Sequence, residues 1–478
     1  MKPHKILFFL LLALALTACA QPTAAPTPTA APPSHTPIPP TVTFSPPPPT
    51  ATITPSPVPS HTPTATPTAT ATPTDNPYLS IRCLQVFAGL PPVASLEGVL
   101  AFQSTSDLDA PAFLLDLGSG ERTVLETAAN ERRSRYSVST GGHWLSFVRT
   151  LFDDQGAFRE RSLVVLDARG QEQASFPLSE HQSTIYPRGG TWLDDQRILI
   201  WPGYNPSVDY SPHGDEAPDY YQMQVVNPFA YQSTTLDMRG AWGFDIFAPD
   251  EAPWEVPVVP DPTLRWVAYP GYITTTTGAE IGYDIALLLW DRQSDNRVGI
   301  PLEVYQERLN SRHGYPQEGP KWSPDGTRLV FISWNSGGEE LVIVDREGQV
   351  LQKTRLGDVY EQITIADYVW SPDGSQIAFW MSYPHKPSSG TYQSWRGYEE
   401  MLALLDVASG QVTNLCIPMD SGLVLLNPVW SPDGRYLVVS SYNGEHQRVV
   451  LVDLFSNDAF VILNVGVQPV GWMVNPGE

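Results

Sequence analysis

The chain has 478 residues, a formal net charge of −23 and 48 prolines. So acidic a balance argues against nucleic-acid binding, which needs a basic face, and no nucleic-acid partner is expected. The hydrophobic fraction of 42% is enough for a core. The roughly 400 residues after the proline-rich N-terminal part can form one large repeat-built domain or two ordinary ones.

Residues 1–18 are predicted to be an export signal. Two lysines supply its positive end, and the apolar run Ile6–Leu16 is shorter than the roughly 20 residues that a membrane-crossing helix needs. The following Leu-Thr-Ala-Cys sequence ending at Cys19 resembles a bacterial lipobox. That resemblance implies cleavage before Cys19, lipid (diacylglycerol and palmitate) on the mature N-terminus, and attachment to the extracytoplasmic face of the cell membrane. The alternative is an ordinary secretory signal with an incidental cysteine.

Residues 19–76 are predicted to be a disordered stalk. Between Ala20 and Asn76, 18 of 57 residues are proline and 16 are threonine. Such a segment has almost nothing apolar to bury, and proline favours an extended polyproline conformation. The stalk would hold residues 77–478 away from the membrane, although a linker without a selected length fits the composition equally well.

Three segments share a Trp-Ser-Pro-Asp-Gly motif followed by an apolar strand: Lys321–Ser333, Val369–Trp380 and Val429–Ser441. Proline presets the first corner of a turn, aspartate can bond the backbone amides ahead of it, and glycine takes the left-handed conformation. A second apolar strand that ends in aspartate, a short polar turn and a last strand follow each copy. The repeat unit is therefore predicted to be a four-stranded antiparallel sheet, which needs neighbours to bury both faces.

These motifs resemble the TolB-type β-propeller repeat, a relative of the tryptophan–aspartate repeats. The resemblance implies an all-β propeller of about seven blades over residues 77–478, with six or eight left open. Weaker copies extend it through 138–147, 192–200 and 259–269. Residues 99–116 look like a blade without its first strand, and Pro469–Trp472 is predicted to supply that strand and close the ring.

Two cysteines remain besides Cys19. Cys83 precedes the first blade and Cys416 ends the outer strand of the sixth, so a disulfide between them would fasten the lead-in to the rim near the seam. Two separate buried thiols are the alternative.

The long connections are all predicted to emerge on one face of the ring and the short turns on the other. Gly271–Tyr283 and Ser382–Tyr398 are among the long ones, and binding residues are expected there, because function concentrates on elaborated loops. Their aromatic residues suit contact with a protein or a glycan, unless they fold back to pack the loops themselves. The candidates are Tyr204, Tyr210, Tyr220, Tyr272, Tyr383, Tyr392, Trp395 and Tyr398.

No catalytic motif, cofactor site or metal site is predicted. Acidic residues between Asp209 and Asp219 lack a calcium-loop spacing, and five histidines on the long-connection face form no local ligand motif. These histidines are His181, His213, His313, His385 and His446. The expected function is a surface or periplasmic lipoprotein that binds a protein or glycan partner as a scaffold or receptor. The alternative is a propeller lyase or hydrolase acting on surface polysaccharide or peptide.

Overall fold

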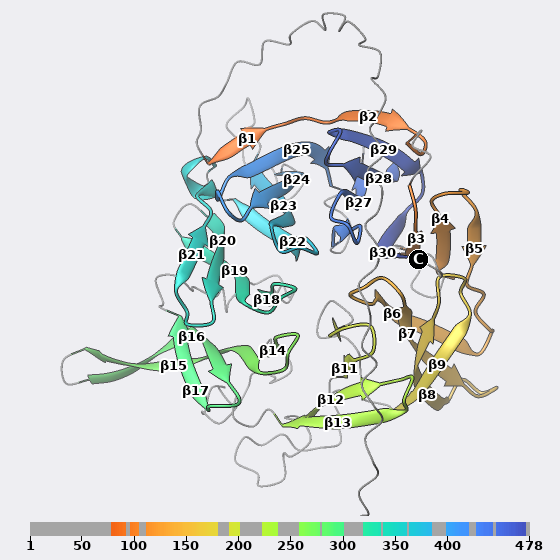
Figure 1. Cartoon of the computed structure of the whole chain (residues 1–478), viewed down its shortest axis with the longest axis horizontal. Helices are drawn as coiled ribbons and strands as arrows, with labels where there is room; N and C mark the ends of the chain where they lie inside the picture. The colour runs from red at the N-terminus through yellow and green to blue at the C-terminus, as the bar shows by residue number, and fades with distance from the viewer. Residues whose placement is uncertain are drawn as a thin grey trace, which may run out of the picture. The chain divides into compact units, whose positions relative to one another are not determined.

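Seven β-sheets are arranged around a ring in the computed structural model of the chain (Figure 1). The sheets are the blades of a propeller, so the predicted all-β fold and the count of seven are confirmed. The structure describes residues 78–91, 96–104, 111–179, 191–200, 222–237, 258–277, 280–300, 319–335, 338–360, 363–384, 398–419, 427–442 and 446–474. Within each blade the strands are lettered A to D from the centre outward.

The first four blades follow the chain order, except that blade 1 takes its strand A from the C-terminal end. Blade 1 consists of β30 (Val467–Met473), β3 (Val99–Ser104), β4 (Phe113–Asp116) and β5 (Arg122–Val124). Blade 2 consists of β6 (Glu131–Val138), β7 (Leu145–Phe152), β8 (Phe158–Leu166) and β9 (Glu172–Leu178). Blade 3 consists of β10 (Thr191–Trp192), β11 (Ile198–Ile200), β12 (Gln222–Asn227) and β13 (Gln232–Asp237). Blade 4 consists of β14 (Val259–Pro260), β15 (Trp266–Thr277), β16 (Glu280–Asp291) and β17 (Asn296–Ile300).

The last three blades carry the full sequence motif. Blade 5 consists of β18 (Lys321–Trp322), β19 (Arg328–Asn335), β20 (Gly338–Asp345) and β21 (Val350–Lys353), followed by the short helix η2 (Leu356–Asp358). Blade 6 consists of β22 (Thr364–Trp370), β23 (Gln376–Pro384), β24 (Tyr398–Asp406) and β25 (Val412–Pro418). Blade 7 consists of β26 (Val429–Trp430), β27 (Tyr436–Tyr442), β28 (Gln447–Asp453) and β29 (Asp458–Leu463).

The motif residues close the turn between strands A and B within one blade. In blade 5 the Ser323 hydroxyl donates to Asp325 at 2.5 Å and accepts from the Arg328 N–H at 3.0 Å. Gly326 has a φ of +67°, the left-handed conformation that favours glycine. Blades 6 and 7 repeat this arrangement with Ser371 and Ser431. The sequence motif is thus a local turn device.

The motif tryptophans join consecutive blades. Each is buried and donates its indole N–H to a carbonyl of strand A in the preceding blade: Trp322 to Val259, Trp370 to Lys321 and Trp430 to Val369, at 2.9–3.3 Å. Trp192 of blade 3 bonds the matching carbonyl of blade 2, Ser137, in the same way. The motif tryptophans are therefore core residues that also fix the spacing between blades.

Segments from the beginning and the end of the described residues take part in closing the ring. β30 pairs antiparallel with β3, with Leu100 opposite Trp472, so the predicted terminal strand is confirmed. A second closure was not predicted. β1 (Leu79–Ile81) and β2 (Gln85–Ala88) run across the outer edges of blades 6 and 7 and add a fifth, parallel strand to each (Figure 1). We call residues 78–88 the strap.

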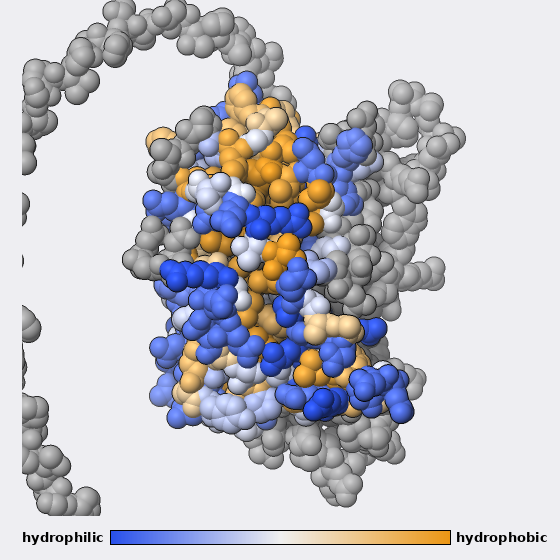
Figure 2. Space-filling view, turned by 90° about the vertical axis from the view of Figure 1, so that its right-hand side faces the viewer, coloured by the Kyte–Doolittle hydropathy of each residue, from blue (hydrophilic) through white to orange (hydrophobic). Residues whose placement is uncertain are grey.

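A disulfide at Cys83, between β1 and β2, attaches the strap to blade 6. Cys83 and Cys416 are bonded in the structure, with their Cα atoms 4.8 Å apart, where β25 of blade 6 ends. Within the strap, Val86 and Phe87 are about two-fifths exposed, at 42% and 39%. In Figure 2 apolar residues gather near the upper end of the described surface, the level at which Figure 1 places β2. The strap therefore adds apolar surface to the rim as well as pairing with it.

One predicted loop is instead a hairpin. The expectation that Gly271–Tyr283 forms a connection is wrong, because β15 and β16 pair continuously, with Tyr272 opposite Ile285 and Thr277 opposite Glu280. Ile273 and the four threonines that follow it are β-branched and favour an extended strand. Figure 1 shows the two strands projecting beyond the ring.

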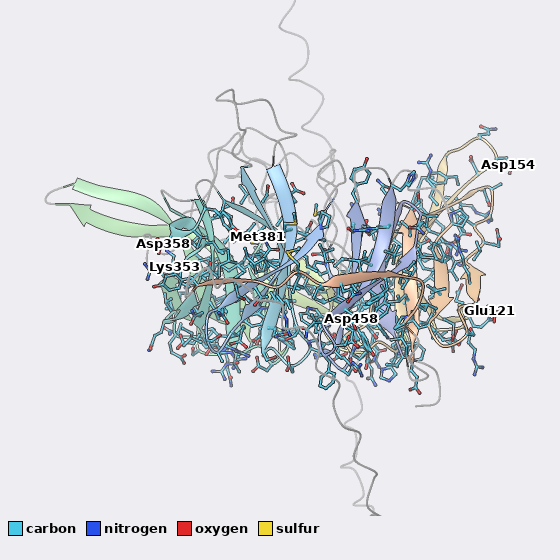
Figure 3. The ribbon with its side chains drawn as sticks, turned by 90° about the horizontal axis from the view of Figure 1, so that it is seen from above. Glu121, Asp154, Lys353, Asp358, Met381 and Asp458 are labelled. Atoms are coloured by element: carbon cyan, nitrogen blue, oxygen red, sulfur yellow. A yellow bond between two sulfur atoms is a disulfide. The ribbon has the colours of Figure 1, made fainter. Side chains whose placement is uncertain are left out.

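The two faces of the ring carry different connections. Glu121 and Asp458 follow the C–D turns of blades 1 and 7 and lie on the lower side of Figure 3. Asp154, from the B–C turn of blade 2, lies on the upper side. A–B and C–D turns therefore share one side, which we call the short-turn face.

Candidate functional site

A groove with a volume of about 470 Å³ opens between blades 2 and 3 on the short-turn face. Its walls are the A–B turn of blade 2 and both the A–B and C–D turns of blade 3. The lining residues are His143, Trp144, Asp195, Gln196, Asn227, Phe229 and Ala230. We call this feature the blade 2/3 groove.

The blade 2 wall is a variant of the motif turn. The N–H of Ser139 donates to the carbonyl of Trp144, and the Trp144 N–H donates to the Ser139 hydroxyl at 3.1 Å. Ser323 and Arg328 of blade 5 make the same two bonds. Ser139 therefore occupies the motif serine position and Trp144 the position of Arg328.

This alignment puts Gly141 where the motif has aspartate, so the blade 2 turn has no carboxylate of its own. Asp195 of blade 3 supplies one. Its Oδ1 accepts from the Ser139 hydroxyl at 2.6 Å and from the Gly141 N–H at 2.9 Å, and its Oδ2 accepts from His143 Nδ1 at 2.9 Å. In blade 5, Asp325 Oδ1 likewise accepts from the Ser323 hydroxyl, and Oδ2 accepts from the Thr327 hydroxyl. Thr327 is the residue that matches His143. The carboxylate has the same role but comes from the next blade.

Glycine at position 141 is required by this arrangement. A Cβ placed there would lie 2.2 Å from Asp195 Oδ2, much closer than atoms approach without displacement. The absence of a side chain at Gly141 is therefore what lets the neighbouring carboxylate reach the turn.

Asp195 is available because the blade 3 turn is one residue shorter than the motif. There Asp194 bonds its own turn, accepting from the N–H groups of Gln196 and Arg197 at 2.8 and 2.7 Å and from the Arg197 guanidinium at 2.6 Å. Partial desolvation raises the pKa of Asp194, but these donors outweigh it and hold the pKa below its usual value. Asp194 closes the blade 3 turn, and Asp195 is left to face blade 2.

Two aromatic rings form the apolar part of the groove. The rings of Trp144 and Phe229 are 4.9 Å apart between centroids and inclined by 50°. Trp144 packs partly against the core between blades 2 and 3, whereas Phe229 is 39% exposed. Phe229 therefore presents part of its ring to solvent while the ring of Trp144 packs against it.

The polar groups of the groove are oriented by the turns that carry them. The side-chain oxygen of Asn227 accepts from the N–H groups of Phe229 and Ala230 at 3.1 and 3.0 Å, which directs its amide NH2 away from the turn. Because a carboxylate only accepts, Nδ1 of His143 carries the proton on its bond to Asp195, which in a neutral imidazole leaves Nε2 as an acceptor. The His143 side chain is 51% exposed, so this acceptor is open to a ligand.

The aromatic residues predicted from the long connections either lie outside the described residues or are described by their backbone positions alone. Tyr204, Tyr210, Tyr220, Tyr392 and Trp395 lie outside the described residues, as do Cys19 and the stalk. Tyr272 lies on β15, and Tyr383 and Tyr398 lie on adjacent strands β23 and β24, opposite Glu399 and Pro384. These backbone positions leave the predicted ligand contacts as predictions.

The groove residues were not among the predicted sites. Two sequence signals pointed to them: glycine replaces the motif aspartate at Gly141, and the copy at 192–200 is one residue short. Nothing in the sequence shows that the two departures compensate one another across the blade boundary.

Within the described ranges, no group of three or more His, Cys, Asp or Glu side chains could hold a metal ion. None of the helices in those same ranges is long and apolar enough to cross a membrane. Of the five histidines considered for a metal, only His446 is described, immediately before β28.

No protein-family model matches the chain. A curated relative, the uncharacterized peptidase YuxL of Bacillus subtilis (strain 168), is 31% identical over 147 residues; the match covers 26% of this chain and only 21% of that protein.

Three solved structures with detectable likeness are distant in sequence. TolB from Acinetobacter baumannii has 13% identity and a TM-score of 0.36, with 80% of this chain and 68% of that chain covered. An oligogalacturonate lyase from Vibrio parahaemolyticus has 12% identity and a TM-score of 0.43, with 77% and 86% covered. The periplasmic gluconolactonase of Pseudomonas aeruginosa has 15% identity and a TM-score of 0.41, with 79% and 99% covered. The chain is thus a seven-bladed β-propeller by its own strand pairing, and these likenesses assign it no activity.

Proposed function

We propose that the propeller is a binding module that engages its partner through the blade 2/3 groove. The observation that carries this proposal is the carboxylate of Asp195, which leaves its own blade to complete the turn of the neighbouring blade. The result is a fixed groove with an exposed aromatic ring and oriented polar groups. Violations of a local structural pattern occur where a structure serves function rather than the fold alone, and here two such departures meet at one groove.

The proposal includes the cellular setting that the N-terminal sequence suggests. Lipid on Cys19 would hold the protein at the extracytoplasmic face of the membrane, and residues 19–76 would connect the lipid to the propeller. Metabolic labelling with a palmitate analogue tests this setting, since Cys19→Ser should abolish both the label and the membrane fraction. Label on the Cys19→Ser variant would contradict it.

The long connections are proposed as a second contact surface through Tyr392 and Trp395. Alanine at either position should weaken partner binding if that surface contributes. Unchanged binding in both variants would restrict the interaction to the blade 2/3 groove.

A retention assay tests the groove. Full-length protein is mixed with the insoluble envelope fraction of the source cells, and bound protein is measured after washing. Phe229→Ala should reduce retention, because it removes the exposed ring. Phe455→Ala is the matched control, since Phe455 is also an exposed aromatic residue of a C–D turn, 83% accessible, but lies in blade 7. Equal loss in both variants, or in neither, would contradict the proposal.

The alternative function is hydrolysis or elimination on a surface polysaccharide or peptide. One observation favours it: the Asp195–His143 pair resembles a carboxylate-oriented general base, with Nε2 facing solvent. Product release from a polymer that stops in His143→Ala, while partner retention persists, would establish the enzyme.

A further inference from the structure

We propose that the blade 2/3 groove recognises a neutral saccharide. This inference rests on the binding function proposed above and specifies the chemical class of the ligand. Four properties of the groove support it: its charge, its free hydrogen-bonding groups, its aromatic surface and the state of its backbone groups.

The groove offers no full counter-charge to an ionic ligand. Asp195 is its one carboxylate, and three protein donors from blade 2 already occupy the two oxygens. Arg197, on the blade 3 A–B turn, is bonded to Asp194 and is not among the described lining residues. Among the described lining residues, an anionic ligand would find no lysine or arginine to pair with, and a cationic ligand would compete with three existing bonds.

The remaining polar groups suit hydroxyls. Asn227 presents an NH2 donor, His143 presents the Nε2 acceptor, and the exposed Gln196 amide can both donate and accept. A sugar hydroxyl also donates once and accepts twice, so neighbouring hydroxyls can satisfy a mixed set of this kind. The polar groups are therefore complementary to a polyol ring rather than to an apolar ligand.

The aromatic surface suits the opposite side of such a ring. Phe229 is 39% exposed, and Trp144 supports it at 4.9 Å. The C–H groups of a pyranose form an apolar face that can lie on an aromatic ring, whose own faces are electron-rich. A volume of about 470 Å³ lies within the range of small-molecule sites, and the groove is open at the surface.

The groove offers an extended peptide few main-chain hydrogen bonds. Peptide recognition commonly uses main-chain bonds to a free strand edge. The groove walls are turns whose N–H groups are engaged: Gly141 with Asp195, and Phe229 and Ala230 with Asn227. A peptide would find side-chain contacts but few main-chain partners.

The test is calorimetric titration of the purified full-length protein with trisaccharides, in a detergent that carries no sugar. The neutral probes are cellotriose, mannotriose and triacetylchitotriose. The charged probes are trigalacturonate and deacetylated chitotriose, and a capped neutral hexapeptide is included. At least one neutral trisaccharide should bind saturably and more tightly than both charged ones. Phe229→Ala should weaken that binding about tenfold.

Two further variants protect the interpretation. Phe229→Leu keeps an apolar side chain without the ring and should also weaken binding if Phe229→Ala does not fold. Phe455→Ala should leave affinity within about twofold of wild type, because Phe455 lies in blade 7.

Binding restricted to charged sugars or to the peptide, binding unchanged in both Phe229 variants, or no binding at all would overturn the saccharide assignment. Envelope retention separates this failure from failure of the binding function. If retention depends on Phe229 while every saccharide is silent, the groove binds a partner of another class. If retention does not depend on Phe229 and no saccharide binds, both proposals fall.

Discussion

Blades 2 and 5 build the same A–B turn from different sources of carboxylate. In blade 5, Ser323 and Asp325 belong to one motif and bond across two residues. In blade 2, Ser139 bonds Asp195, 56 residues later and one blade away. The first turn can close as soon as its own strands form, whereas the second needs its neighbour in place. A local device has become a connection between blades, and the hollow beside it is the candidate binding site.

Blade 4 shows that the motif can change without creating a site. Asp261 occupies the serine position and accepts from the N–H groups of Arg265 and Trp266, while Thr263 donates to the same carboxylate at 2.6 Å. Leu264 takes the glycine position with a φ of +62°. The hydroxyl and the carboxylate have exchanged positions within the blade, so the turn is closed by its own carboxylate, which also accepts from Arg346 of blade 5 at 3.0 Å. Sequence divergence alone is therefore a poor guide to the binding site, and the origin of the carboxylate is a better one.

The largest effects, which are on the free energy of unfolding, should be equal at the blade 2/3 boundary and at the blade 5/6 boundary. Trp192 and Trp370 are both buried and both bond the preceding blade. Alanine at either position should lower the free energy of unfolding by about 3–5 kcal/mol, measured by denaturant unfolding. If Trp192→Ala cost less than half as much as Trp370→Ala, the difference between the regions would extend from the turns into the core.

Restoring the motif aspartate should be harmful in blade 2. The Gly141→Asp side chain would collide with Asp195, at a cost of about 1–3 kcal/mol in the free energy of unfolding. Adding Asp195→Ala removes the collision and lets blade 2 close its own turn, so most of the stability should return. Ligand binding should not return, because the connection between blades is lost.

Thr140→Ala is the control for that pair, since Thr140 is an exposed neighbour in the same turn. It should change stability by no more than about 0.5 kcal/mol. A Gly141→Asp protein as stable as wild type, with ligand binding intact, would show that Asp195 is dispensable.

Double-mutant cycles compare the two serine–carboxylate bonds directly. The pairs Ser139→Ala with Asp195→Ala, and Ser323→Ala with Asp325→Ala, should each give a coupling energy of about 0.5–3 kcal/mol. Hydrogen exchange should then distinguish them. Asp325→Ala should raise exchange in one blade, and Asp195→Ala in two. Exchange confined to blade 3 in Asp195→Ala would contradict the connection.

The smallest effect is a pH dependence in the motif turns. The Ser371 hydroxyl, helped by the Ser375 N–H, holds the pKa of Asp373 below its usual value against partial desolvation. A depressed carboxyl pKa contributes stability above the unfolded-state pKa of about 4, and that contribution disappears as the pH falls through the folded-state pKa. Titration of the Asp373 carboxyl carbon by NMR should give a low midpoint, and Ser371→Ala should raise it. An unchanged midpoint would mean that the serine does not set it.

Sequence reasoning predicts the ring well because three motif copies each encode a turn locally. The seam is predictable from the repeat pattern, because the first blade lacks its strand A and the sequence around Trp472 matches that missing strand. The strap is not predictable, since residues such as Ser80 and Val86 carry no repeat signal and pair in parallel with strands more than 300 residues away. The groove combines both cases. The glycine at position 141 and the short turn that contains Asp195 are both visible in the sequence. That the Asp195 carboxylate serves the turn of Gly141 is visible only in the folded structure.

The bond between Cys83 and Cys416 has a mechanical consequence. It converts the chain from the strap to the end of blade 6 into a covalently closed loop, whose ends lie 333 positions apart in sequence. Tension applied ahead of Tyr78 divides at Cys83. One path runs forward through blade 1 to blade 2, and the other crosses to blade 6 and runs back to blade 3. A load on the blade 2/3 groove is therefore carried along two covalent routes in parallel, one to each wall.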